Sequence, residues 1–176
     1  MPFQHPDHLS KNKTASQRKA LPLASALVAL SVVSPNVLAQ TLAPIVISAT
    51  VELNFGTFTA GAGGGTVVIS QGGGRNVTGS VTAITGAGLE TPASLSLSAS
   101  TGESVVISMD AAAYNAVNET GAIMAINNFD INGSGVTATV VVTTNPLSVP
   151  VGATINVNAA QPEGVYKGSY VVNANY

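Results

Sequence analysis

Apolar and polar residues alternate with a period of two along much of the chain after residue 40. From Ile45 to Phe55 the odd positions are apolar and most even positions are polar. This alternation is typical of a β-strand with one face in the core and the other in solvent. Further strand-like segments follow at 66–70, 77–85, 95–99, 105–109, 123–129, 136–143, 153–158 and 165–175.

Glycine-rich and polar turns separate these segments. Gly72–Gly74 and Thr101–Gly102 have turn composition. We interpret the glycines of the stretch from Gly61 to Gly74 as long turns within one domain, because the single strand before it could not fold alone. Ala111–Val117 favours one helical turn, and no window has a sustained helical stripe. Closely spaced strands with turns between them predict an all-β sandwich or barrel.

The first 39 residues have the pattern of a secretory signal peptide. Four basic residues between positions 11 and 19 precede an apolar run at 20–33, and Val37 and Ala39 precede the expected cleavage point. The apolar run is shorter than the ~20 residues that a membrane-spanning helix needs. We expect cleavage after Ala39 and a single domain over 40–176 with no stable membrane span. The protein is then exported, to the periplasm, the cell surface or the extracellular space.

Cleavage at this point limits the available chemistry. Both histidines and four of the six basic residues precede it, so residues 40–176 keep Arg75 and Lys167 against seven acidic side chains. The sequence contains no cysteine, which excludes disulfides and thiolate ligands. Without histidine, a Ser-His-Asp triad is excluded as well. The acidic balance argues against nucleic-acid binding. We therefore expect no enzymatic activity, no cofactor and no metal.

Weaker motifs favour structural interpretations. The carboxylates have no informative spacing and tryptophan is absent, so a glycosidase pair is not indicated. Asn127–Gly133 offers oxygen ligands of the kind that bind calcium, but its composition favours a hairpin turn. Lys167 is better explained as a solubilising edge charge than as a catalytic base. Asn76, Asn118 and Asn132 begin glycosylation triplets that composition alone explains.

The last strand-like segment has the most distinctive pattern in the sequence. Alternate positions from 166 to 176 place one set of residues on a common strand face. These residues are Tyr166, Gly168, Tyr170, Val172, Ala174 and Tyr176.

Three pieces of sequence together resemble the bacterial family of exported proteins called domain of unknown function 4402. They are Leu53-Asn54-Phe55-Gly56, residues 65–70, and the segment GATINVNAAQPEGVYKGSYVVNANY at 152–176. That family is similar in pattern to spore-coat-U-type and fimbrial (pilin) subunits. The resemblance implies a single immunoglobulin-like antiparallel β-sandwich.

The resemblance also implies a mode of assembly. In fimbrial subunits a periplasmic chaperone grips a final strand that contains glycine and a near-terminal tyrosine. The matching positions here, as a candidate chaperone or strand-exchange strand, are Gly164, Tyr166, Gly168, Tyr170 and Tyr176. Leu42–Phe55 could serve as a donated N-terminal strand, or it could be the first strand of the domain itself. Many of these relatives carry a disulfide, which this chain cannot form.

Our leading hypothesis is therefore an exported, non-enzymatic structural or surface protein that assembles with its own copies by strand addition. The alternative is a monomeric secreted module that binds a glycan or a protein. It predicts an exposed patch around Phe58, Tyr114 or Phe129. A small outer-membrane barrel ending in Tyr176 conflicts with the shortage of aromatic residues for membrane girdles.

Overall fold

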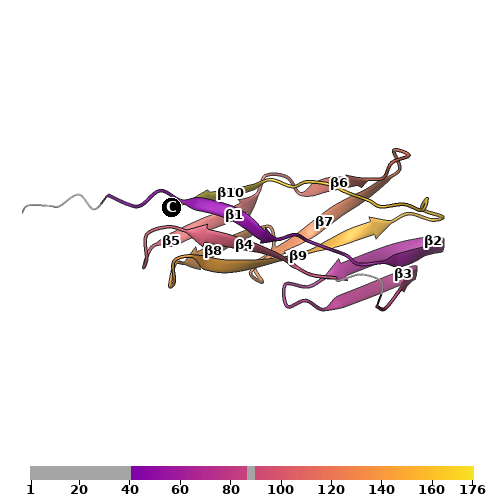
Figure 1. Cartoon of the computed structure of the whole chain (residues 1–176), viewed down its shortest axis with the longest axis horizontal. Coiled ribbons are helices and arrows are strands. Elements are labelled where there is room, and N and C mark those ends of the chain that lie inside the picture. The colour runs from indigo at the N-terminus through magenta and orange to yellow at the C-terminus, as the bar shows by residue number, and fades with distance from the viewer. Residues whose placement is uncertain (1–40, 87–89) are drawn as a thin grey trace, which may run out of the picture. The chain divides into compact units, whose positions relative to one another are not determined.

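The computed structural model describes residues 41–86 and 90–176, and this part of the chain is built from β-strands without a helix (Figure 1). The signal-peptide interpretation of residues 1–39 lies outside the described residues. The strands are β1 (Val46–Val51), β2 (Phe58–Ile69), β3 (Arg75–Ala83), β4 (Ala93–Ser98), β5 (Ser104–Met109), β6 (Ala113–Val117), β7 (Ile123–Ile131), β8 (Thr137–Val141), β9 (Leu147–Val157) and β10 (Val172–Asn175). The all-β prediction is confirmed.

The strands form two antiparallel sheets. In the larger sheet the order is β1-β4-β9-β2-β3, with β7 paired to β9 and β6 paired to β7. The smaller sheet has the order β10-β5-β8. Strand β9 organises the larger sheet, because its first half pairs with β4 and its second half lies between β2 and β7. The two sheets pack as a sandwich, as the sequence predicts.

The core lies between the two sheets and is entirely aliphatic and aromatic at its centre. On β4, the side chains of Ala93, Leu95 and Leu97 are buried, while the serines between them are half-exposed. Val105 and Ile107 of β5, in the smaller sheet, belong to the same core and have no exposed surface. The period-two pattern therefore places the apolar faces of both sheets against each other.

The structure corrects the prediction of a helical turn at Ala111–Val117. Residues 113–117 form β6, which pairs antiparallel with β7 from Ala113 opposite Asn127 to Val117 opposite Ile123. Tyr114 and Ala116 alternate inward against the core. The ladder to β7 satisfies backbone groups that one isolated helical turn would leave largely unbonded.

The interpretation of Gly61–Gly65 as part of a long turn is also wrong. These residues lie within β2, with an irregular register opposite β3 between Ala60 and Gly65. A Cβ atom on Gly61 or Gly65 would collide with backbone carbonyl oxygens of β3. Glycine therefore permits a close approach of two strands here. The turn predicted at 72–74 is present between β2 and β3.

Strand β1 belongs to the domain's own sheet. Its register with β4 runs from Val46 opposite Ser98 to Val51 opposite Ser94. A further antiparallel bridge joins Asn54 to Thr91. The sequence left two alternatives for residues 42–55, a donated strand or the first strand of the domain. The structure supports the second, because β1 pairs with β4 of the same domain. No helix in the described ranges is long and apolar enough to cross a membrane.

Candidate functional site

An apolar groove of about 1500 Å³ lies between two chain segments at the open side of the sandwich. We call residues 47–60 the N-terminal wall and residues 161–172 the C-terminal wall. The N-terminal wall begins with β1, the edge strand of the larger sheet, and the C-terminal wall leads into β10, the edge strand of the smaller sheet (Figure 1). The floor between the walls consists of Leu95, Ala116, Met124, Ile126, Phe129 and Ile155.

The walls shield this floor from solvent. Phe129 is 2% exposed and Leu95 is 3% exposed, whereas Ile47 and Val172 on the walls are half-buried. The apolar floor is therefore largely covered by the two walls.

Three aromatic rings connect the floor to the C-terminal wall. The ring of Phe129 lies 5.6 Å from that of Tyr114, edge to face, and 5.6 Å from that of Tyr170. The Tyr114 hydroxyl accepts a hydrogen bond from the Ala111 amide at 3.0 Å and donates one to the Val171 carbonyl at 3.1 Å. This cluster fixes the position of the C-terminal wall.

The exposed aromatic patch that the binding-module hypothesis predicts is not formed. Phe129 is buried, and Phe58 and Tyr114 are half-buried. All three residues line the groove. Their aromatic surface is therefore directed into the sandwich rather than toward a surface ligand.

Burial raises the pKa of the Tyr170 hydroxyl above its usual 10.0, and the negative charge of Glu52 raises it further. The folded protein therefore holds this proton more tightly than the unfolded chain. This contribution to stability is complete below about pH 10 and is lost as the pH rises through the folded-state pKa. We expect the free energy of unfolding, measured with urea, to fall as the pH rises above about 10. The fall should be smaller in Tyr170→Phe, and an equal fall in both proteins would contradict this assignment.

The alternation predicted for residues 165–175 is confirmed only in part: Val172–Asn175 alone forms a regular strand, and Gly168 and Tyr176, which the prediction places on the inward face, are exposed. Tyr166, Tyr170 and Val172 are half-buried, while the residues between them are exposed. Before β10, this segment is joined to β6 by an isolated bridge between Val117 and Lys167.

The two glycines of this segment allow it to pack closely on β6. A Cβ atom on Gly168 would lie 2.5 Å from the Asn115 carbonyl oxygen, so only glycine fits without a shift of the backbone. Gly164 has a φ of +142° and lies beside the Asn118 side chain. Of the five candidate residues at this end of the chain, Tyr166 and Tyr170 line the groove, and both glycines also contribute to its C-terminal wall. Tyr176 lies after β10.

Asn118 has a structural role that the sequence did not reveal. The residue is 7% exposed. Its Oδ1 accepts hydrogen bonds from the amides of Thr120 and Ala122 and from the Thr120 hydroxyl. Its Nδ2 donates to the Glu163 carbonyl at 3.1 Å and to the Tyr166 hydroxyl at 3.4 Å. Asn118 therefore holds the start of the C-terminal wall, and its amide is committed to these bonds.

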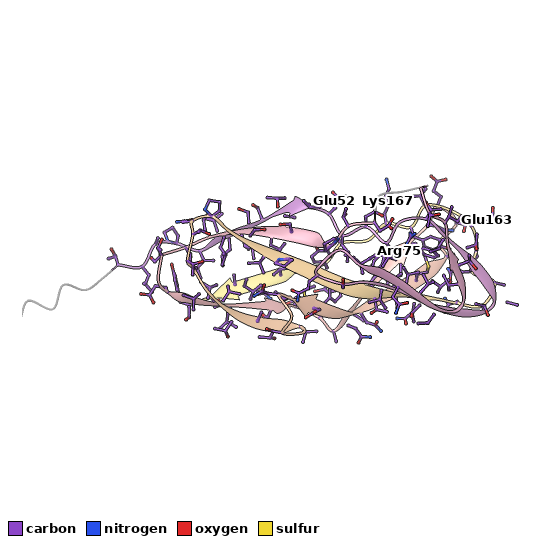
Figure 2. All side chains as sticks on the ribbon, turned by 90° about the horizontal axis from the view of Figure 1, so that it is seen from below. Glu52, Arg75, Glu163 and Lys167 are labelled. Atoms are coloured by element: carbon purple, nitrogen blue, oxygen red, sulfur yellow. The ribbon has the colours of Figure 1, made fainter. Side chains whose placement is uncertain are left out.

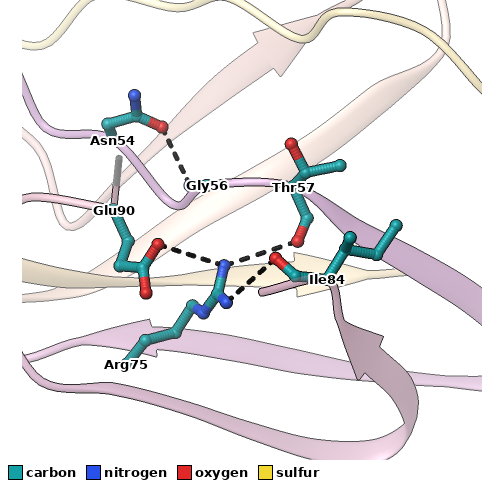
Figure 3. Close-up of polar contacts among 6 residues, drawn as sticks. All are labelled: Asn54, Gly56, Thr57, Arg75, Ile84 and Glu90. Atoms are coloured by element: carbon teal, nitrogen blue, oxygen red, sulfur yellow. Dashed lines mark hydrogen bonds and ion pairs between the residues drawn. The ribbon is translucent and has the colours of Figure 1, made fainter. Parts of the chain in front are cut away.

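Arg75 fixes the N-terminal wall where β2 begins (Figure 3). Its guanidinium donates to the carbonyls of Thr57 and Ile84 at 3.4 and 3.3 Å, and it lies 3.5 Å from a Glu90 carboxylate oxygen. The Arg75 side chain is only 6% exposed. Gly56 has a φ of +72°, and a Cβ atom there would lie 2.5 Å from this guanidinium. The Leu-Asn-Phe-Gly piece of the sequence therefore makes room for a buried arginine.

Charged side chains are few on the groove walls. Glu52 lies on the N-terminal wall, and Glu163 and Lys167 lie on the C-terminal wall (Figure 2). Within residues 41–86 and 90–176, no group of three or more histidines, cysteines or acidic residues could hold a metal ion.

The segment Asn127–Gly133 forms the end of β7 and the turn toward β8. Asn132 and Gly133 have φ values of +50° and +79°, and the Asp130 carboxylate accepts a hydrogen bond from the Gly135 amide at 3.0 Å. The predicted hairpin turn is wrong: residues 127–131 are part of β7, and the turn after them leads into β8, which lies in the other sheet and pairs with β5.

A comparison with known families finds one match, to the model described as "Domain of unknown function (DUF4402)", over residues 45–176. No curated protein and no solved structure gives a significant match.

Proposed function

The chain belongs to the domain of unknown function 4402 family, and from that premise we propose that it is an exported, non-enzymatic structural or surface protein whose copies assemble by strand addition. The observation that carries this proposal is the groove between β1 and the C-terminal wall. An extended segment inserted there would lie between β1, at the edge of the larger sheet, and the segment that leads into β10, at the edge of the smaller sheet.

Strand addition has two physical requirements. The first is an edge whose backbone groups are open to pairing, since backbone hydrogen bonds supply the affinity. Strand β1 pairs with β4 and strand β10 pairs with β5. The other edge of each strand has no neighbouring strand in the part of the chain that the structure describes. The second is a set of pockets for alternate side chains, and the apolar floor from Leu95 to Ile155 supports this requirement.

The distribution of charge also supports self-assembly. Natural edge strands are commonly protected from unwanted pairing by lysine, proline or other charged residues. Neither β1 nor β10 contains a charged residue. Export places the protein where such an edge can meet other copies or a periplasmic chaperone. The partners in this proposal are therefore copies of the same chain, with a chaperone before assembly.

The proposal is tested on cells that produce the protein. Material sheared from the surface is compared on a denaturing gel with and without boiling. We expect a ladder at multiples of the mature mass that collapses on boiling, because strand-exchanged subunits are held without covalent bonds. A single band of mature size in both lanes would contradict assembly by strand addition.

A further inference from the structure

Three segments that are far apart in the sequence meet beside the end of the groove. The Tyr176 hydroxyl accepts a hydrogen bond from the Ser100 amide at 3.1 Å and donates one to the Ala43 carbonyl. The Ala43 amide in turn donates to the Ser100 Oγ at 2.7 Å. Ala43 precedes β1, Ser100 follows β4, and Tyr176 follows β10. We call these three residues the clasp.

The clasp joins the two walls across the open side of the sandwich. Ala43 leads into the edge strand of one sheet and Tyr176 follows the edge strand of the other. At the opposite end of the groove, the Ala160 amide donates to the Gly61 carbonyl at 3.3 Å. The walls are therefore tied at both ends, with the groove between them.

The segments that the clasp joins are otherwise lightly held. Five of the six residues of β1 are exposed, and Val46 is 57% exposed. Strand β10 has four residues and pairs only with β5. Tyr176 itself is 43% exposed, so water can compete for its hydrogen bonds. A contact of this kind can open and close while the core stays folded.

We propose that Tyr176 is a latch that limits entry of a strand into the groove. This inference rests on the proposed function, because the strand it excludes is that of a second copy of the chain. A strand that enters the groove must pass between the two walls. The Tyr176 hydroxyl holds the walls together at this end, because it bridges the Ala43 carbonyl and the Ser100 amide. The latch must therefore open before a strand can lie along the whole groove.

The test compares two Tyr→Phe variants of the purified mature protein. Tyr176→Phe removes only the latch hydroxyl. Tyr114→Phe is the comparison for the exchange measurement alone, because its hydroxyl also makes two hydrogen bonds but joins the Ala111 amide to the Val171 carbonyl and does not connect the walls. Ladder formation is compared with the wild type, since Tyr114 itself lines the groove. Amide hydrogen exchange of β1 in the monomer reports the latch, and the rate of appearance of the gel ladder reports assembly.

We expect the β1 amides to exchange about tenfold faster in Tyr176→Phe than in Tyr114→Phe or the wild type. A tenfold change in the exchange rate corresponds to about 1.4 kcal/mol. Tyr176→Phe should also form the ladder faster than the wild type. Equal β1 exchange in the two variants would overturn the latch. Faster β1 exchange with a ladder that forms at the wild-type rate would overturn its role in limiting strand entry. If no protein forms a ladder, the proposed function fails, and the exchange data alone then decide whether the clasp holds β1.

Discussion

Replacement of Phe129 by alanine should lower the free energy of unfolding by about 3–5 kcal/mol, the usual range for a fully buried aromatic side chain. Phe129 is 2% exposed, and its ring contacts those of Tyr114 and Tyr170 at 5.6 Å each. The substitution removes buried apolar surface, leaves a cavity and breaks both aromatic contacts. Because Tyr170 lies on the C-terminal wall, the same change should loosen that wall.

Urea unfolding at neutral pH measures this effect. Phe58→Ala is the matched control, because Phe58 also lines the groove but is half-buried at the start of β2. It should cost clearly less stability than Phe129→Ala. A loss below about 1 kcal/mol for Phe129→Ala would be inconsistent with its central position in the core.

The strands that the sequence predicted well are those whose two faces meet different environments. On β4, serines alternate with Leu95 and Leu97, and the structure leaves the serines half-exposed and buries the leucines. The C-terminal alternation predicted the inward face of Val172 and Ala174 in the same way, whereas Gly168 and Tyr176, which it assigns to that face, are exposed. Two-fold periodicity therefore identified the strands in which it is regular.

The misses occurred where local preference and tertiary packing disagree. Ala111–Val117 has little β-branched character, and it becomes β6 because β7 and the aromatic cluster provide partners for it. The glycines at 61–65 have turn composition, but there the need for close approach to β3 decides the structure. Residues 147–152 were missed as the first half of β9, although Leu147, Val149 and Val151 alternate through Pro150.

The groove itself could be predicted only in part. The tyrosines of its C-terminal wall were identified from their spacing. The clasp, Asn118 and the Arg75 contacts were not identified, because they depend on residues brought together from distant parts of the chain. Tyr176 and Ala43, for example, are separated by 133 positions. No local pattern encodes such a contact, which is fixed by the order of strands in both sheets.

A lysine that points into the groove should abolish assembly, whereas a lysine on the opposite face of the same strand should not. Ile47 of β1 and Val172 of β10 line the groove from its two walls. Their neighbours Val46 and Asn173 are exposed, and successive residues of a strand point to opposite faces. Ile47→Lys and Val172→Lys would each place an ammonium group where an incoming strand must pack its apolar side chains, and burial of an unpaired charge is strongly unfavourable.

The four single variants, with Val46→Lys and Asn173→Lys as controls, are compared by the intensity of the boiling-sensitive ladder. We expect at least a tenfold loss for the two inward lysines and a near wild-type ladder for the two outward ones. The ammonium group of a half-buried lysine can reach solvent in the monomer, so urea unfolding should show that all four proteins remain folded. A ladder lost equally on both faces would indicate a general effect of charge on the edge strands. A ladder retained in all four folded variants would mean that the groove is not where the copies join.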